Sequence, residues 1–401
     1  MPGVPEGLGF INSVPRRYFP LMFSPTRANT AATCRLRAGW LAAWALVFFA
    51  LAVPVAAQAQ IVLQDVTGRE VTLAAPAKRL LIDDGRFLIA LALIHRDPVS
   101  VLAAWPRDIN RIGTRTYDAY RARFPAIDAL AKVASSAGAV SVEQVVAAQP
   151  DLAVFSLGAQ PSPEERARIE AAGIPVVVID FFTHPLVNLE PSLTLLGAAT
   201  GGSAKAQEFL AFRRAHLDAV REKLAGLTEA ERPRVFLEPH AAMTADCCNS
   251  PGRGNVGDII EAVGGTNIGA AVIPRAFGKL NLEYVVAQDP QVYIATGGSH
   301  MEGTAGLLIG PEYSAATARE RLARLLERPG FSGFAAVRDR RVHGLSHQLL
   351  NSPLDLITVE ILAKWIHPRR FGALDVEGTV AQVNERFLAV PVEGPNWISL
   401  D

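Results

Sequence analysis

Residues 141–155 read SVEQVVAAQPDLAVF, and residues 281–295 repeat the same pattern as NLEYVVAQDPQVYIA. Each copy begins with a helix-capping side chain, places a glutamate at the second helical position and continues with a pair of valines. A proline then closes the helical part, and an apolar run suited to a buried strand follows. A helix–strand unit that recurs 140 positions later predicts two similar α/β lobes.

A long helix is predicted between the two copies, from Ser203 to Leu224, with Gly226 beyond its end. Its apolar residues follow helical spacing, and its 22 residues at 1.5 Å each span roughly 33 Å, the breadth of a small domain. We therefore expect an N-terminal lobe over 60–198, a bridging helix over 199–228 and a C-terminal lobe over 229–401 that ends in a helical tail. Because residues 204–224 contain no obvious hinge, the bridge should restrict closure of the lobes.

The rest of the chain alternates between apolar runs and helical stretches. The runs suited to strands occur at residues 61–63, 71–73, 79–82, 99–104, 152–156, 175–180, 234–238, 292–295 and 341–344. Residues 105–124 are predicted to form a polar, aromatic loop. This alternation predicts an α/β fold with two Rossmann-like lobes of parallel sheet, joined by one long bridging α-helix.

The N-terminal segment has the features of a secretory signal peptide over 1–59. Its uninterrupted apolar run, from Trp40 to Val53, has 14 residues, whereas a spanning helix needs about 20. Arginines precede the run and an A-x-A motif ends at Ala59, so we expect cleavage after Ala59 and a periplasmic mature protein. An uncleaved membrane anchor is the alternative, and Met22 is a second possible start besides Met1.

The overall charge is balanced, with 39 basic and 39 acidic residues. This balance argues against a nucleic-acid-binding protein, which usually carries a strong basic excess. Removal of residues 1–59 takes away five arginines and one glutamate, so the mature chain has 34 basic and 38 acidic residues. Three cysteines are too few for a disulfide scaffold.

Several further segments carry a family resemblance. They are DVTGREVTLAAPAKRLL (65–81), AAGIPVVVID (171–180), GDIIEAVGGTNIG (257–269) and RPGFSGFAAVRDRRVHGL (328–345). In this order, together with the repeat, they resemble the periplasmic substrate-binding proteins of ABC-type iron-complex and cobalamin import systems. The resemblance runs from about Val62 to Pro368. It implies two lobes joined by one helix, a ligand between the lobes, delivery to an ABC permease dimer in the inner membrane, and no enzymatic activity.

The ligand class also follows from this resemblance. Residues 346–371, SHQLLNSPLDLITVEILAKWIHPRRF, are similar to the iron-complex branch, which implies a ferric siderophore as cargo and no resident cofactor. Haem, cobalamin and bare zinc or manganese ions are the alternatives. We expect the mature protein to be a monomer.

Glu143 and Glu283 occupy the matching second helical positions of the repeat. The matching glutamates of the resembling family pair with arginines of the permease dimer, so the resemblance implies that these two dock the permease. A carboxylate in the first turn also favours the helix dipole by about 0.3–1 kcal/mol, which is the purely structural explanation.

Ligands of open parallel sheets bind outside the carboxyl ends of the strands. Arginines there provide planar donors for the anionic oxygens of a siderophore, and tryptophan or tyrosine provides a flat face. The side chains in these loops that we expect to bind ligand are Arg86, Trp105, Arg115, Tyr117, His240, Arg253 and His347.

Other signals fit less well. Residues 252–257 read GRGNVG but do not directly follow a strand, as a dinucleotide site would require. A bare-metal site needs three or four converging ligands, and the chain has no histidine-rich tract. No G-x-S-x-G, P-loop or H-E-x-x-H motif occurs. A secreted α/β hydrolase or metalloenzyme remains the alternative from another class.

Cys247 and Cys248 are the only cysteines of the mature chain. Adjacent cysteines can form a vicinal disulfide in an oxidising compartment, or remain free thiols, or bind a soft metal. Bracing of their loop is the favoured role, and a ligand-binding role is the alternative.

Overall fold

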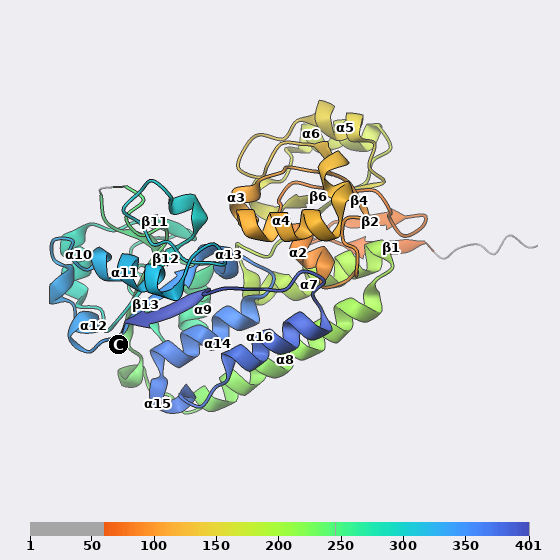
Figure 1. Ribbon diagram of the computed structural model, residues 1–401. Coiled ribbons are helices and arrows are strands. Elements are labelled where there is room, and N and C mark those ends of the chain that lie inside the picture. Colours follow the sequence, from red (N-terminus) through yellow and green to blue (C-terminus); the bar gives the residue numbers. More distant parts are fainter. Residues whose placement is uncertain (1–59, 245, 401) are drawn as a thin grey trace, which may run out of the picture. The chain divides into compact units, whose positions relative to one another are not determined.

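The computed structural model, shown in Figure 1, describes residues 60–244 and 246–400. The expected signal peptide and its cleavage site lie outside the described residues. Within the described part of the chain, no helix is both long and apolar enough to cross a membrane.

The N-terminal lobe contains a five-stranded, fully parallel sheet in the order β5-β4-β3-β6-β7. Its strands are β3 (Leu80–Ile82), β4 (Leu102–Trp105), β5 (Ala131–Lys132), β6 (Leu152–Ser156) and β7 (Val176–Ile179). All residues of β3, β4, β6 and β7 are buried, as expected for a sheet with helices on both faces. The accompanying helices are α2 (Phe87–Ala92), α5 (Val142–Ala148), α6 (Pro163–Ala171) and α7 (Pro185–Thr200). An antiparallel pair, β1 (Ile61–Gln64) and β2 (Glu70–Leu73), precedes this sheet.

The C-terminal lobe contains a second five-stranded sheet, in the order β10-β8-β12-β13-β14. Its strands are β8 (Arg234–Glu238), β10 (Thr266–Asn267), β12 (Val292–Gly297), β13 (Val342–Ser346) and β14 (Trp397–Leu400). The first four are parallel, whereas β14 joins the edge in the antiparallel sense. A small separate sheet pairs β9 (Asn249–Pro251) with β11 (Phe277–Lys279).

The main helices of this lobe are α9 (Val256–Ala262), α10 (Leu282–Gln288), α11 (Ala315–Leu325), α13 (His347–Leu350), α14 (Asp355–Ile366), α15 (Pro368–Phe371) and α16 (Val376–Arg386). The last helix of this lobe is α16, and strand β14 follows it at the end of the described chain. The final strand β14 was not predicted, because a single short apolar run at the chain end carries no local sign of its partner.

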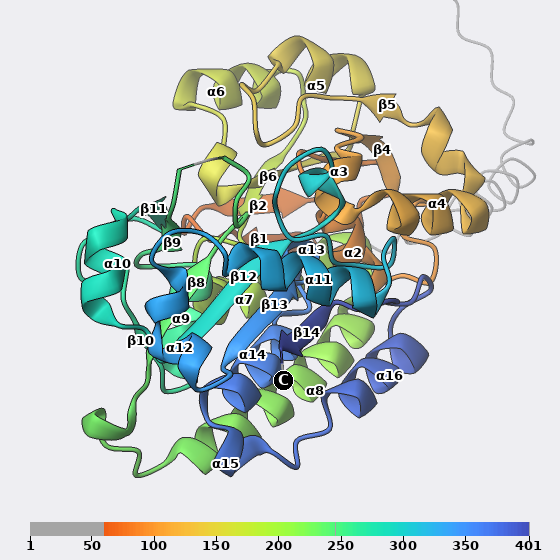
Figure 2. The same ribbon diagram turned by 60° about the vertical axis from the view of Figure 1, so that its left-hand side comes forward.

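The predicted bridging helix is α8, which spans Ser203–Leu224. Both views show α8 beside α14 and α16 (Figures 1 and 2). Arg213 of α8 donates to Asp355 of α14 through Nε at 2.8 Å and Nη2 at 2.6 Å, and both side chains are almost fully buried. A buried bidentate pair of this kind fixes the orientation of two packed helices. The fold class is thus two α/β lobes joined by one long helix.

The prediction of a loop over residues 105–124 is wrong. The segment forms two helices, α3 (Ile109–Ile112) and α4 (Thr114–Arg123), separated at Gly113, whose φ is +88°. In α4 only Tyr120 is buried, so the helix lacks the apolar stripe from which an amphipathic helix is predicted in a sequence.

The two copies of the repeat have the same local structure. The Ser141 hydroxyl accepts from the Gln144 N–H at the start of α5, and the Asn281 side chain accepts from the Tyr284 N–H at the start of α10. Both helices end at a residue in the left-handed conformation, Gln149 and Asp289 respectively. Each lobe therefore carries one copy of the same capped helix and its following strand.

Candidate ligand-binding site

A cavity of about 340 Å³ receives side chains from both lobes. The N-terminal lobe contributes Arg86, Asn110 and Arg111, and the C-terminal lobe contributes His240, His300, His347, Gln348 and Asn351. These residues follow β3, β4, β8, β12 and β13, so the cavity lies at the carboxyl ends of parallel strands in both sheets.

Two arginines of the N-terminal lobe share one buried carboxylate, that of Asp84. Arg86 binds it in a bidentate manner at 2.9 and 2.8 Å, and Arg111 Nη1 lies 2.5 Å from Asp84 Oδ2. Burial alone would raise the pKa of Asp84, but the hydrogen bonds and charges of Arg86 and Arg111 outweigh burial and lower this pKa to about 2. The ionised Asp84 holds both guanidinium groups in place.

The face of Arg86 is also fixed. Its guanidinium carbon lies 3.5 Å from the centre of the Phe182 ring, a cation–π contact. The Asp108 carboxylate braces both Arg111 and the turn beside Arg86. Its Oδ2 lies 3.2 Å from Arg111 Nε, and its Oδ1 accepts from the Gly85 N–H at 2.9 Å. The arginine side of the cavity is therefore preorganised by partners outside the cavity itself.

The neighbouring carboxyl of Asp83 is buried against Ser156, which donates to it from both its N–H and its hydroxyl. Burial raises the pKa of Asp83 to about 7, the Ser156 hydrogen bonds oppose this rise, and the charges of Asp84 and Asp108 add to it. Asp83 therefore sits behind the arginine cluster as a carboxyl that carries its proton up to about neutral pH.

Three histidines line the opposite wall. His240 Nδ1 and His300 Nε2 are 2.7 Å apart, and the rings of His240 and His347 have centroids 3.8 Å apart. Burial lowers the pKa of all three imidazoles, that of His240 to about 4, with the charge of His300 adding to the shift of His240. At neutral pH these rings are uncharged and can offer nitrogen lone pairs to a ligand.

Hydrogen bonds determine which lone pairs are free. The Asn351 amide donates to His347 Nε2 at 2.8 Å, so the His347 proton lies on Nδ1 and is donated to Thr296 Oγ1 at 3.0 Å. His347 is therefore committed to a supporting role. Among the described residues, His240 Nε2 and His300 Nδ1 have no hydrogen-bond partner. Because neutral His240 and His300 share one proton in the hydrogen bond between their rings, one of these two open nitrogens is a lone-pair acceptor and the other carries an N–H.

His240 itself has an unusual backbone, with φ at +51°, in the left-handed region that non-glycine residues seldom occupy. Its N–H donates to Thr296 Oγ1 at 3.0 Å, which holds this conformation. A left-handed non-glycine residue costs on the order of 1 kcal/mol and is typical of binding sites, where the surrounding structure imposes it.

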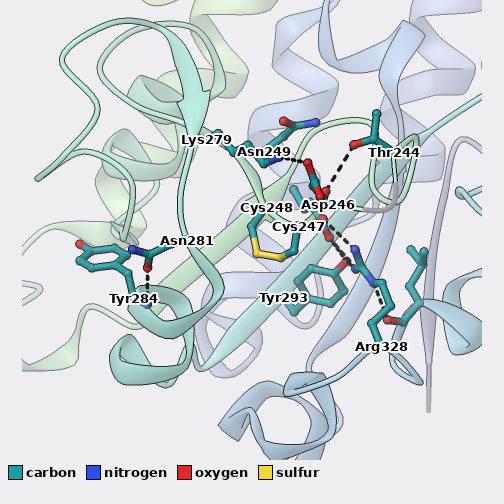
Figure 3. The surroundings of a disulfide bond; sticks show 12 residues. Thr244, Asp246, Cys247, Cys248, Asn249, Lys279, Asn281, Tyr284, Tyr293 and Arg328 are labelled. Atoms are coloured by element: carbon teal, nitrogen blue, oxygen red, sulfur yellow. Dashed lines mark hydrogen bonds and ion pairs between the residues drawn. A yellow bond between two sulfur atoms is a disulfide. The ribbon is translucent and has the colours of Figure 1, made fainter.

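The loop that follows His240 carries a disulfide between Cys247 and Cys248 (Figure 3). Cys248 is fully buried, and its carbonyl accepts from the Leu280 N–H at 2.9 Å. The Asn249 side chain reaches back to the carbonyl of Pro239, the residue before His240, at 3.2 Å. Neither cysteine lines the cavity. These contacts fit a bracing role for the disulfide.

The structure brings three of the seven predicted ligand residues to the cavity: Arg86, His240 and His347. Trp105 corrects the expectation of a flat face for the ligand, because its side chain is fully buried and stacks on the half-buried Tyr117 at 5.9 Å between ring centres. Tyr117 in turn donates to Asp128, which follows α4 on the chain. Trp105 is the last residue of the buried strand β4 and Tyr117 lies on the unpredicted helix α4, and neither side chain lines the cavity.

Two predicted arginines also lie elsewhere. Arg115 Nη1 donates to the Pro311 carbonyl at 3.0 Å, which joins the two lobes outside the cavity. Arg253 is exposed, and its Nε donates to the Ala270 carbonyl at 3.4 Å. Sequence reasoning missed Arg111 and His300. Both lie in segments that follow predicted strands, but nothing local distinguishes them from their neighbours.

The two repeat glutamates are exposed on separate lobes. Glu143 is 76% exposed and forms an ion pair with Arg168 at 2.7 Å. Its pKa is lowered by its own backbone N–H first and by Arg168 second, which agrees with a place in the first helical turn. Glu283 is exposed and makes no ion pair within the described residues.

Comparison with solved structures places this geometry in a known fold. FepB from Veillonella parvula, a TroA-like periplasmic binding protein, has a TM-score of 0.76 at 24% identity, over 85% of this chain and 100% of that chain. The molybdate-bound MolA of Haemophilus influenzae has a TM-score of 0.64 at 18% identity, over 83% and 99%. CeuE of Helicobacter pylori with a Ni-His complex has a TM-score of 0.61 at 18% identity, over 82% and 95%. At these identities the likeness concerns the fold alone.

No curated protein matches the chain at a significant level of similarity. The sequence pattern of the family described as periplasmic binding protein matches residues 91–349, well over half of the chain. The two-lobe architecture and the cavity between the lobes agree with this match. The chain therefore belongs to the periplasmic binding protein family.

Proposed function

We propose that this protein captures a chelated ferric complex, a siderophore, between its lobes and delivers it to the permease of an ABC transporter. Members of the family are solute-binding proteins that act outside the cytoplasm with such permeases and are typically not enzymes. The observation that supports the proposal is that Arg86 and Arg111 of one lobe face His240 and His300 of the other across one cavity.

This pairing favours a metal complex that carries anionic oxygens. The Arg86 and Arg111 N–H groups that Asp84 and Asp108 do not bind can donate to carboxylate, hydroxamate or catecholate oxygens, whereas a bare zinc or manganese ion has no acceptor for them. Neutral imidazoles can also supply nitrogen to a metal that has an open coordination position. The two walls thus complement different parts of the same ligand.

Isothermal titration calorimetry against ferric hydroxamate, catecholate and citrate complexes, haem, cobalamin and Zn²⁺ tests the proposal. We expect one ferric complex to saturate a single site. Arg86→Gln and Arg111→Gln should each weaken the affinity for this complex at least tenfold, which corresponds to about 1.4 kcal/mol. Arg253→Gln is the matched control, since Arg253 is an exposed arginine away from the cavity. Saturable binding of free Zn²⁺ with no response to any ferric complex would contradict the proposal.

The same experiment addresses the hydrolase alternative. We expect mass spectrometry of the released complex to return the chelator unchanged after prolonged incubation. Cleaved chelator, produced by the wild type and not by Arg86→Gln, would favour an enzyme.

We also propose that residues 1–59 are removed on export. N-terminal sequencing of protein recovered from the periplasm should begin at Gln60. Recovery of the full-length chain from the membrane fraction would instead favour an uncleaved anchor.

A further inference from the structure

The C-terminal lobe contains a second cavity, of about 600 Å³, that is larger than the one between the lobes. It lies between the sheet edge formed by β13 and β14 and the helices α14, α15 and α16, which neighbour each other in Figure 1. Strand β13 begins at this cavity, and His347, the residue after the strand, lines the first cavity. A volume of several hundred Å³ is typical of a small-molecule site.

Aromatic side chains form much of the wall. Trp365 of α14 stacks on His343 of β13, with ring centres 4.5 Å apart and planes 6° apart. Trp397 of β14 also lines the cavity, and the strand register places Ser399 opposite His343 and Trp397 opposite Leu345. His343 and Trp397 therefore belong to the same face of the sheet edge, the face toward α14.

Two polar atoms at this wall have no partner among the described residues. They are His343 Nε2 and Arg341 Nε, whose residues both line the cavity and stand two positions apart on the chain. The other groups of the same side chains are occupied: His343 Nδ1 lies 2.8 Å from Ser399 Oγ, and Arg341 Nη2 donates to the Trp365 and Ile366 carbonyls. Native proteins seldom leave buried polar atoms unpaired, and Arg341 Nε–H is a donor that requires an acceptor.

The charges around the cavity balance. Three basic side chains, Arg340, Arg341 and Lys364, stand with three acidic ones, Asp339, Asp375 and Glu377. Lys364 donates to the Leu374 carbonyl, and Asp375 caps α16 through the Gly378 N–H, so these two groups already have partners. The wall therefore carries no excess charge, which favours an uncharged aromatic ligand over a charged one.

From these observations we infer that this cavity is a second ligand site, for a small, uncharged, planar aromatic compound that carries a hydrogen-bond acceptor on its edge. The ring would lie against the tryptophan and histidine wall. The Arg341 and His343 nitrogens are enclosed by neighbouring side chains, so the acceptor would reach them once side chains of the wall move aside. The inference is independent of the nature of the cargo between the lobes.

Benzamide is a suitable probe, with cyclohexanecarboxamide as the matched compound that has the same amide on a saturated ring. In protein labelled at the indole nitrogens, the signals of Trp365 and Trp397 should shift saturably with benzamide. The signal of Trp105, in the other lobe, should not shift. Trp397→Leu should weaken binding at least tenfold, and Arg86→Gln should leave it unchanged.

Because Trp397→Leu can disturb the sheet edge, His343→Phe provides a second variant that keeps a ring in the stack but removes the nitrogens. His343→Phe should also weaken the affinity for benzamide at least tenfold, while its circular dichroism spectrum remains as in the wild type. Absence of a saturable shift, equal affinity for the two probes, or loss of binding in Arg86→Gln would each overturn the inference.

Discussion

The protonation state of the cavity histidines decides which contacts they can offer to the proposed ferric complex. His240 and His300 are neutral at pH 7, because burial lowers their pKa, and each keeps one ring nitrogen without a partner. Neutral rings act as nitrogen ligands or hydrogen-bond partners, whereas charged rings would act only as additional cations beside Arg86 and Arg111. Affinity as a function of pH separates these two roles.

We predict that affinity for the ferric complex falls as the pH is lowered from 7 to 4, with His240 becoming protonated at about pH 4. Calorimetry with a complex whose visible spectrum is itself unchanged over this range measures the effect. An affinity that increases on acidification below pH 6.5 would mean that the histidines bind the cargo as cations.

The carboxyl of Asp83 predicts a specific change in stability. The unfolded chain releases this proton near pH 3.8, whereas the folded protein retains it to about pH 7. Raising the pH from 4 to 7 therefore lowers the free energy of unfolding of the wild type, and the contribution of Asp83 to this decrease is on the order of 4 kcal/mol at most. Asp83→Asn does not incur this loss, so its free energy of unfolding relative to wild type should increase over that interval.

Urea unfolding of both proteins at pH 4.5 and pH 7 measures this difference, and the comparison cancels the opposing contribution of the buried histidines. Ser156 still has an acceptor in the asparagine side chain. A difference between the proteins that is the same at both pH values would show that Asp83 is ionised throughout.

At the scale of elements, the two short helices α5 and α10 present equivalent exposed glutamates, one per lobe. The resemblance implies that Glu143 and Glu283 meet two basic patches on a twofold-symmetric permease, and charge complementarity across such a surface is physically reasonable. Glu143 has a local partner in Arg168, and Glu283 has none within the described residues. Docking at Glu143 therefore requires exchange of one arginine partner for another.

We predict that Glu143→Arg and Glu283→Arg each abolish transport in a reconstituted system and leave the affinity for the ferric complex within twofold of wild type. Glu164→Arg, in the first turn of α6, is the matched control for a reversed charge at a helix start and should transport normally. Transport that survives reversal at both repeat positions would leave only the helix-dipole explanation.

At the scale of the whole molecule, the bridge should limit lobe movement. Helix α8 has no glycine or proline between residues 204 and 224, and the buried Arg213–Asp355 pair ties it to α14. Contacts outside the cavity also join the lobes, including Arg115 to the Pro311 carbonyl and the Asn255 N–H to the Thr183 carbonyl at 2.7 Å. A long packed helix without a kink-forming residue resists bending.

We predict that ligand binding changes the radius of gyration, measured by small-angle X-ray scattering, by less than about 3%, since preorganised partners usually move little. Comparison of the ligand-free and ligand-saturated protein at equal concentration provides the measurement. A clear compaction on binding would contradict the rigid bridge and require a hinge elsewhere.

The fold class, the two copies of the repeat and the limits of α8 could be predicted from the sequence, because caps, prolines and apolar periodicity act over a few neighbouring residues. The domain boundaries that we drew from it stay a prediction. It also indicated that ligand side chains follow the strands, and three of them, Arg86, His240 and His347, line the cavity. Where the local signal is weak, as in the polar helix α4, the same reasoning predicted a loop.

Which loop residues meet depends on how the strands and helices pack in three dimensions. His240 and His300 are 60 positions apart on the chain, and they touch because β8 and β12 are neighbours in the sheet. Trp105 is the last residue of the apolar strand β4 and Arg86 follows the apolar strand β3, yet Trp105 is buried in the core and Arg86 lines the cavity. The order of strands and the packing of helices on them are set by contacts distant in sequence, and for that reason no local pattern could identify Arg111 and His300 or the cavity beside His343.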